Sequence, residues 1–161
     1  MVDLPHYVYP VKELVYHPRV RGWCKLRYPN HPKGCPNYGK HLGCPPQCAY
    51  VTQMFEMKAV FYLVHSEFDL ASHVERMREK HPHWTERQLR NVLYWQGRSK
   101  KQLKQRVEEA QNLLGCDTYH TYPEAVGVHM YVTCIKSGLR LEKIKNITVC
   151  KHVALLGWSK R

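Results

Sequence analysis

Residues 24–48 of this chain read CKLRYPNHPKGCPNYGKHLGCPPQC and hold four of its seven cysteines, Cys24, Cys35, Cys44 and Cys48. Five prolines and three glycines in the same stretch favour turns and prevent a long helix or a central strand. An irregular segment of this length buries little apolar surface and needs another source of order. A metal ion or cluster bound by the thiolates would supply it. We therefore expect a cysteine-rich metal-binding loop over residues 20–48.

The length and composition of the chain suit one globular domain over residues 1–161. With 43% hydrophobic and 24% charged residues, the chain is long enough to bury a single sizeable core. No apolar run approaches the length of a membrane span, and the first residues lack the pattern of a secretory signal. We expect a cytoplasmic protein, and in that reducing setting seven cysteines favour metal binding over disulfide bonds.

The formal net charge of +12 predicts attraction to polyanions. Nucleic acid, either RNA or DNA, is the partner that this charge favours first, and an acidic protein is the second. We expect no association with a membrane. A generally basic composition without a polyanionic partner is the alternative explanation of the charge.

The expected order of elements predicts an α+β fold in which a small mixed sheet is flanked by helices. Asp69 can cap one helix, and Gly138 stands where another can end. A strand over residues 128–133 is the alternative to that second helix. From hydrophobic periodicity and residue type we expect strands at residues 58–65, 139–144 and 147–156, and helices at residues 49–58, 69–80, 85–115 and 125–137.

Residues 85–115 form the longest helical pattern, a basic amphipathic region. Thr85 and Gln88 are spaced as a capping box at its start. The apolar stripe is weakest at residues 97–99, so the region is either one bent helix or two. Between residues 87 and 106 there is no acidic residue, and the basic residues are Arg87, Arg90, Arg98, Lys100, Lys101, Lys104 and Arg106.

These seven basic residues are the predicted nucleic-acid-binding surface. Each phosphate that such a residue neutralises releases counterions and makes the affinity depend on salt. Tyr94 and Trp95, with Trp84 ahead of them, can stack on unpaired bases. Core packing is the alternative role for the two aromatic residues, and a solvated helix face is the alternative for the basic ones.

The spacing of the loop cysteines favours an iron–sulfur cluster over zinc, and we expect the 4Fe-4S kind. Structural zinc sites usually use two closely spaced cysteine pairs, and this loop has no such C-x2-C pair. Cys35 and Cys44 are each followed by proline, as in ferredoxin motifs, and the loop glycines let backbone amides approach inorganic sulfide. Zinc completed by His17, His31 or His41 is the alternative.

Residues 35–46, CPNYGKHLGCPP, resemble the signature of a family of uncharacterised cysteine-rich proteins that are predicted to bind metal. Residues 122–138, YPEAVGVHMYVTCIKSG, are similar to the closing segment of the same family, where a related run leads into a helix. The resemblance is best over residues 20–60 and 114–140. It implies metal binding, and it implies no particular reaction.

The resemblance also implies a ligand set. Family members typically have further cysteines just before the closing segment, where this chain has only Cys116. By position, the implied metal ligands are Cys24, Cys35, Cys44 and Cys116, with Cys48 as the substitute for any one of them. This number of thiolates suits one cluster. Cys134 and Cys150 lie within apolar patterns and are expected in the core.

Together these patterns predict an iron–sulfur-cluster-binding protein that contacts nucleic acid through its basic helical region. The alternatives are an iron–sulfur-dependent redox or sulfur-handling enzyme, and an electron-transfer or accessory subunit that docks on an acidic partner. The sequence has no serine-hydrolase motif and no phosphate-binding glycine-rich loop, so no catalytic residue is assigned. An enzyme would need an open iron site or a placed acid or base, for which the polar candidates are Asp117, Tyr119, His120, Tyr122 and Glu124.

Overall fold

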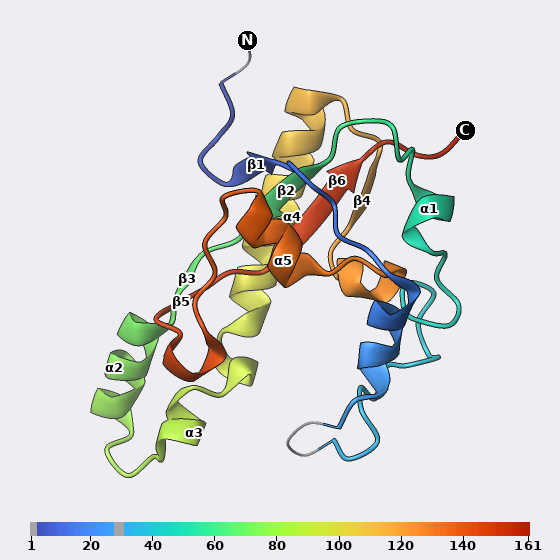
Figure 1. The fold of residues 1–161 in the computed structure, drawn as a ribbon. Helices are drawn as coiled ribbons and strands as arrows, with labels where there is room; N and C mark the ends of the chain where they lie inside the picture. The colour runs from blue at the N-terminus through green and yellow to red at the C-terminus, as the bar shows by residue number, and fades with distance from the viewer. Residues whose placement is uncertain (1–2, 28–30) are drawn as a thin grey trace.

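A four-stranded antiparallel sheet forms the centre of the protein (Figure 1). The structure, a computed structural model, describes residues 3–27 and 31–161. Across the sheet the strand order is β1 (Val8–Pro10), β2 (Tyr62–His65), β6 (Val153–Gly157) and β4 (Thr118–His120), and β3 (Phe68–Asp69) and β5 (Val149–Cys150) form a second, two-stranded sheet. Helices accompany both sheets, which confirms the α+β class. The strand pairs are antiparallel throughout, rather than mixed.

The helices follow the predicted order with different boundaries. They are α1 (Val51–Met54), α2 (Leu70–Lys80), α3 (Glu86–Leu89), α4 (Gln96–Leu114) and α5 (Met130–Lys136), together with the 3-10 helices η1 (Pro18–Lys25), η2 (Val92–Tyr94), η3 (Pro123–Val126) and η4 (Ile144–Asn146). The Asp69 side chain accepts from the Ser72 N–H at 3.0 Å, so the predicted cap of α2 is confirmed. No helix in the described part of the chain is long and apolar enough to cross a membrane.

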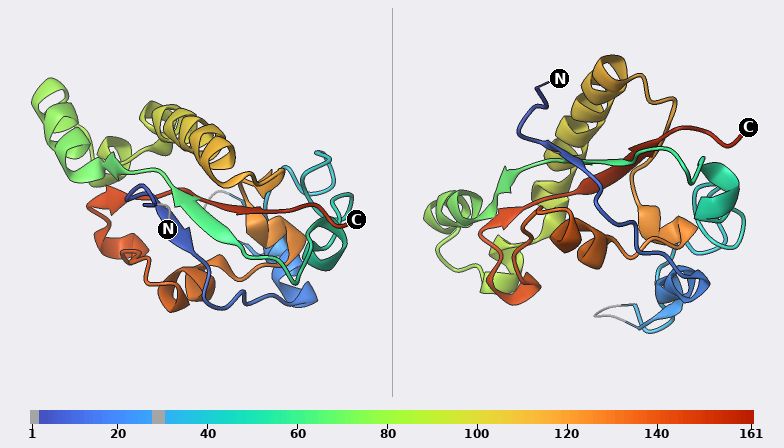
Figure 2. Two further views of the ribbon diagram at one scale, coloured as in Figure 1. Left: turned by 90° about the horizontal axis from the view of Figure 1, so that it is seen from above. Right: turned by 45° about the horizontal axis from the view of Figure 1, so that its top comes forward.

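Two different layers cover the faces of the main sheet (Figure 2). On one face Val64 and Leu156 are buried with Leu103 of α4 in one apolar cluster. On the other face Leu63 and Leu155, which pair across β2 and β6, belong to the cluster that includes α5. Since successive residues of a strand point to opposite faces, the run of apolar residues in β6 serves both layers.

The predicted strand at residues 139–144 is wrong, and the one at residues 147–156 is divided. After α5 the Leu139 N–H donates to the Cys134 carbonyl oxygen at 2.9 Å, and the chain continues as irregular backbone. Ser66 lies between β2 and β3, and His152 lies between β5 and β6. These two breaks lie opposite each other, because Ser66 and His152 are hydrogen-bonded to each other. The Ser66 N–H donates to the His152 carbonyl oxygen at 2.9 Å, and the His152 N–H donates to Ser66 Oγ at 2.9 Å.

The basic region at residues 85–115 contains two α-helices with a 3-10 turn between them. Thr85 and Gln88 form the predicted capping box of α3. The break falls at residues 90–95 rather than at residues 97–99. Trp95 causes this difference, because its ring stacks on Phe68 at a centroid distance of 4.9 Å and its Nε1–H donates to the Arg90 carbonyl oxygen at 3.3 Å. The Trp95 ring is buried against β3, and this position is incompatible with a continuous helix over residues 85–115.

Residues 122–138 lie beside residues 15–17, an early part of the chain. The predicted helix at residues 125–137 is η3 followed by α5, with a turn at Gly127 between them. Here the His17 N–H donates to the Gly127 carbonyl oxygen at 2.8 Å, and the His129 N–H donates to the Val15 carbonyl oxygen at 2.7 Å. These bonds place η1, and with it the cysteine-rich stretch that follows, against η3 (Figure 1).

Candidate metal centre and its surroundings

The four cysteines of the N-terminal stretch lie near one another in the folded chain. The pKa of Cys24 is raised first by burial and then by the neighbouring thiols of Cys35, Cys44 and Cys48. Burial also raises the pKa of Cys44, as do Cys35 and Cys48. Thiols affect one another in this way only when they are close. These four residues are termed the loop thiols below.

Close backbone contact joins the Cys35 turn to the end of η1. The Cys35 N–H donates to the Cys24 carbonyl oxygen at 2.6 Å. Gly34 has a φ of +87°, and a Cβ at this position would collide with the Cys24 carbonyl oxygen and lie 2.7 Å from the carbonyl carbon of Lys25. Glycine is therefore required where these two segments meet. The backbones of Cys24 and Cys35 are thereby held together.

Turns between residues 36 and 48 position Cys44 and Cys48. The Gly39 N–H donates to the Pro45 carbonyl oxygen at 2.7 Å, and Gln47 Nε2 donates to the Gly39 carbonyl oxygen at 2.7 Å. The Cys48 N–H donates to the Cys44 carbonyl oxygen at 3.0 Å, so one turn of backbone separates these thiols. The loop thus has an internal hydrogen-bonded frame that does not depend on a large apolar core.

Cys48 ties the loop to the closing segment. Its side chain is 8% exposed, and its Sγ donates to the Ala125 carbonyl oxygen of η3 at 3.1 Å. Arg21 of η1 donates from Nη2 to the Cys48 carbonyl oxygen at 2.5 Å and lies 3.6 Å from Cys48 Sγ. The Arg21 Nε–H also donates to the Ala125 carbonyl oxygen at 3.2 Å. Arg21 therefore bonds to both the loop and η3.

The structure places Cys116 away from the loop thiols. It is 5% exposed and packs between β4 and α4 with Val8, Leu103 and Ala110. Burial and the Asp117 carboxylate raise its pKa to about 11. The loop thiol Cys48 belongs to the apolar cluster on the other face of the sheet. The geometry therefore groups Cys48, the substitute in the predicted set, with the other three ligands.

The two remaining cysteines occupy the predicted core environments. Cys134 is fully buried on α5, and burial raises its pKa to about 12. Cys150 of β5 is half-buried beside the cluster that contains Phe68 and Trp95, and burial raises its pKa. The structure contains no disulfide, since all seven cysteines are free.

Two of the histidines considered for zinc have structural partners. His17 Nδ1 accepts from the Arg19 N–H at 3.0 Å and caps η1, and His41 Nε2 lies 3.2 Å from Asn37 Oδ1. Among the residues that the structure describes, no three His, Cys, Asp or Glu side chains are arranged to hold a single metal ion. The loop thiols therefore lie near one another but do not surround a single metal-ion position. Their chemistry, four soft sulfur donors, suits zinc or an iron–sulfur cluster.

The polar residues considered for catalysis have different surroundings, and two of them, His120 and Glu124, lie near the cysteine loop. Asp117 accepts from the Ser159 N–H at 2.7 Å and stabilises the end of β6, so its role is structural. His120 faces Gly43 of the loop, and burial lowers the pKa of His120. Burial raises the pKa of Glu124, and its carboxylate contributes to the raised pKa of Cys24. Glu124 thus lies close to the loop thiols.

The seven basic residues of the predicted nucleic-acid surface do not form one face. Arg90 donates to the Ile147 carbonyl oxygen at 3.0 Å, and Arg106 donates to the His65 carbonyl oxygen at 2.9 Å, so both connect segments of the fold. Trp95 is core, whereas Tyr94 is 56% exposed. The basic residues left exposed are Arg87 on α3 and Arg98, Lys100, Lys101 and Lys104 on α4.

Comparison of this chain with protein-family models, with curated proteins and with solved structures finds no match. The resemblance of residues 35–46 and 122–138 to a metal-binding family therefore stays a prediction. What the fold adds is a spatial relation, because Gly43 of the first stretch lies beside Tyr122 of the second, where a Cβ on Gly43 would be 3.5 Å from Tyr122 Cε2. The two stretches of the resemblance are in contact.

Proposed function

We propose that this protein binds an iron–sulfur cluster of the 4Fe-4S kind through Cys24, Cys35, Cys44 and Cys48. The proximity of these four cysteines is the observation that carries the proposal. The Cys35 N–H bonds to the Cys24 carbonyl oxygen and the Cys48 N–H to the Cys44 carbonyl oxygen, and the neighbouring thiols contribute to the raised pKa of Cys24 and of Cys44. Cys48 replaces Cys116 in the set, because Cys116 packs with α4 on the other side of the sheet. A cytoplasmic, reducing location suits thiols that are all free.

The residues around the loop thiols fit an anionic thiolate-bound group. Arg21 supplies a positive charge 3.6 Å from Cys48 Sγ. Gly34 lets the Cys35 turn approach Cys24, because a Cβ at position 34 would collide with the Cys24 carbonyl oxygen. A bound cluster would supply electron transfer or an iron site for a substrate. The protein would hold it in the loop beside η3, where Cys48 bonds to Ala125, and thereby order residues 24–48.

The decisive experiment is anaerobic purification followed by an absorption spectrum, with iron, zinc and acid-labile sulfide counted on the same sample. We expect a broad band near about 400 nm and about four irons and four sulfides per chain. A colourless protein with one zinc would replace the cluster by a structural zinc site. A protein that binds neither metal would refute the proposal.

A matched pair of variants tests the ligand set. Cys48→Ala removes a proposed ligand, and Cys116→Ala removes a cysteine that is comparably buried, at 5% against 8% exposure. We expect Cys48→Ala to lose most of the iron and Cys116→Ala to retain it with a lower thermal midpoint. The reverse result would restore the set implied by the family resemblance.

Contact with nucleic acid is the second part of the proposed function. The net charge of +12 supports it, as does the exposure of Lys100 and Lys104 on α4. The redox or sulfur-handling enzyme and the electron-transfer subunit are the alternatives that a cluster would leave open. A single-stranded oligonucleotide whose affinity falls between about 50 and 200 mM salt would support contact with nucleic acid, and no binding would refute it.

A further inference from the structure

A cleft of about 800 Å³ opens at the incomplete edge of the main sheet. β4 pairs only with residues 155–157 of β6, so the start of β6 at Val153 extends beyond the end of β4. The helices α4 and α5 cover opposite faces of the sheet and wall this gap, with Lys104 on one side and Tyr131 on the other. This volume is typical of pockets for small molecules and cofactors.

The walls of the cleft are basic. Lys100 and Lys104 line it from α4, and no ion pair or hydrogen bond of either side chain is found within the described ranges. Lys151 lines the cleft from the segment before β6, where its Nζ donates to the Arg140 carbonyl oxygen at 3.1 Å. Glu124 is the carboxylic acid that lines the cleft, and burial raises its pKa. An anion entering this space would meet more positive than negative charge.

His152 lines the cleft with one ring nitrogen already engaged. Its Nδ1 lies 2.7 Å from Ser99 Oγ, which in turn lies 2.8 Å from Ser66 Oγ. Ser66 Oγ also accepts from the His152 backbone N–H. Either hydroxyl of the serine pair can donate, and we assign the order in which Ser66 donates to Ser99 and Ser99 donates to His152 Nδ1. This order gives every hydroxyl proton an acceptor and leaves the imidazole as the tautomer with a proton on Nε2. Burial and the nearby Lys100 lower the pKa of His152, which favours this neutral form.

Three tyrosines complete the lining of the cleft. Tyr119, Tyr122 and Tyr131 are 41%, 53% and 47% exposed, so each ring keeps a substantial surface toward solvent. Exposed aromatic rings beside lysines are the combination that stacks a nucleobase while holding its phosphate. Tyr122 also lies beside the loop, since a Cβ on Gly43 would be 3.5 Å from its Cε2.

We propose that this cleft binds a nucleotide, with its phosphate between Lys100, Lys104 and the Nε2–H of His152 and its base against the tyrosines. The inference deepens the proposed contact with nucleic acid by naming where one nucleotide is held. It does not depend on the metal bound by the loop thiols. The nucleotide is either free or one unit of a single strand.

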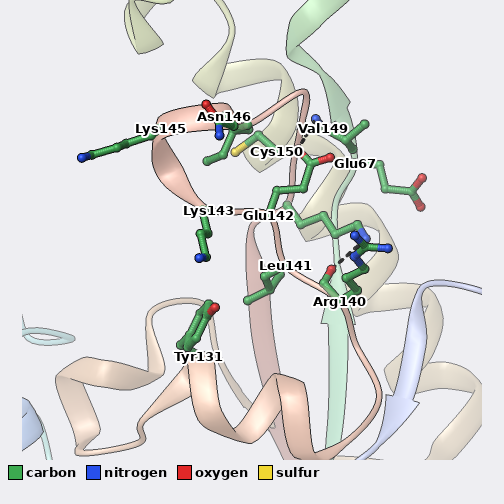
Figure 3. Close-up of a pocket in the computed structure, with 12 residues that line it drawn as sticks. Glu67, Tyr131, Arg140, Leu141, Glu142, Lys143, Lys145, Asn146, Val149 and Cys150 are labelled. Atoms are coloured by element: carbon green, nitrogen blue, oxygen red, sulfur yellow. Dashed lines mark hydrogen bonds between the residues drawn. The ribbon is translucent and has the colours of Figure 1, made fainter.

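A second hollow continues the cleft and favours a strand that extends past one nucleotide. It has a volume of about 1090 Å³ and shares Tyr131, Leu141 and Lys151 with the cleft. Figure 3 shows Tyr131 on α5 at one end of this hollow and Lys145 on η4 near the other. Its carboxylates have partners within the fold, because Glu142 accepts from the Thr148 N–H at 2.6 Å and Glu67 from Arg106 at 3.4 Å.

The test compares two double variants of α4 with equal loss of charge. Lys100→Ala/Lys104→Ala changes the cleft, whereas Arg98→Ala/Lys101→Ala changes exposed residues of the same helix that do not line it. Binding of AMP, of UMP and of a fluorescent seven-nucleotide oligouridylate is measured on the anaerobically purified protein at fixed salt. We expect Lys100→Ala/Lys104→Ala to weaken binding at least about tenfold and Arg98→Ala/Lys101→Ala to weaken it less than about threefold.

Each outcome has one meaning. If Lys100→Ala/Lys104→Ala weakens the binding of AMP and UMP and the control variant does not, the cleft is supported and a free nucleotide is a sufficient ligand. If Lys100→Ala/Lys104→Ala weakens only the binding of the oligouridylate and the control variant does not, the cleft is supported and its ligand is one nucleotide of a single-stranded nucleic acid. Equal weakening by both double variants overturns the cleft and leaves a diffuse basic surface for nucleic acid. No binding of any probe overturns both the cleft and the contact with nucleic acid, while the iron content of the same sample reports independently on the cluster.

Discussion

The cysteine loop and the sheet with its α4 layer contain the same residue type in opposite circumstances. In the loop, four half-buried or buried thiols lie close together on a frame of turns. In the sheet, Cys116 is a small apolar side chain among Leu103, Val107 and Ala110, and burial raises its pKa to about 11. The sheet side is stable through apolar contacts that it makes itself. The loop is expected to need a bound group, and this difference can be tested.

The largest effect is expected from removing one loop thiol. Cys35→Ser or Cys44→Ser should reduce cluster content to less than about a tenth and give colourless or insoluble protein, because a serine hydroxyl is a poor replacement for a thiolate ligand. Iron and sulfide counts on anaerobic samples measure the loss. Cys150→Ser is the control, since this half-buried cysteine lies in a different cluster and should leave the colour unchanged. Brown, normally folded Cys35→Ser and Cys44→Ser proteins would contradict the ligand assignment.

A change that leaves every thiol in place sharpens the comparison. Gly34→Ala should cost about 1–3 kcal/mol in the free energy of unfolding from its φ of +87° alone, and more from the collision with the Cys24 carbonyl oxygen. Because that collision separates Cys24 from Cys35, cluster content should fall by about half or more. Thermal unfolding and an iron count measure the two effects.

The loop provides a matched control for this glycine. Gly39 has a similar φ of +76°, but a Cβ there would meet only Pro46 Cδ, at 4.0 Å. Gly39→Ala should therefore show the backbone strain without the collision and keep most of its iron. Equal iron losses in the two variants would mean that the approach of Cys35 to Cys24 is not what organises the site.

The sequence predicted these two regions unequally well. The proline and glycine content of residues 24–48 and the capping residues Asp69 and Thr85 act locally, so their consequences could be predicted. The helix break at Trp95 could not, because it depends on Phe68, which lies far away in the sequence. Long-range packing of this kind is invisible to periodicity.

The candidate site shows the same limit. The sequence could nominate five cysteines, but choosing between Cys48 and Cys116 depends on which face of the sheet each one reaches. Cys116 precedes β4, and its packing with Leu103 and Ala110 of α4 decides its face. The contact of His152, which lines the cleft, with the buried Ser99 could not be predicted, since the two residues meet only after α4 packs on β6.

Alkylation distinguishes the two kinds of cysteine without a mutation. In metal-free protein at about pH 8, iodoacetamide should modify the half-buried Cys24, Cys35 and Cys44 and leave Cys116 and Cys134 intact. With pKa values raised to about 11 and about 12, the last two thiols have at least about a hundredfold less thiolate than an ordinary cysteine. Peptide mass spectrometry measures the modification at each position. Rapid modification of Cys116 would mean that the packing of β4 on α4 opens readily.

The smallest effect is expected on the sheet side, as a dependence of its stability on pH. Burial lowers the pKa of both His65 and His152. As pH falls through about 6.5 the unfolded chain takes up protons at these positions while the folded protein does not, so the free energy of unfolding decreases toward acid and is retained above that pH. The urea midpoint of metal-free protein should therefore be lower at about pH 5.5 than at about pH 7.5. His83→Gln, which changes an exposed histidine, should keep this difference, and His65→Gln should reduce it. Metal-free protein has no cluster to lose, so cluster loss does not contribute to this difference. Equal urea midpoints at the two pH values would contradict the lowered pKa of the buried histidines.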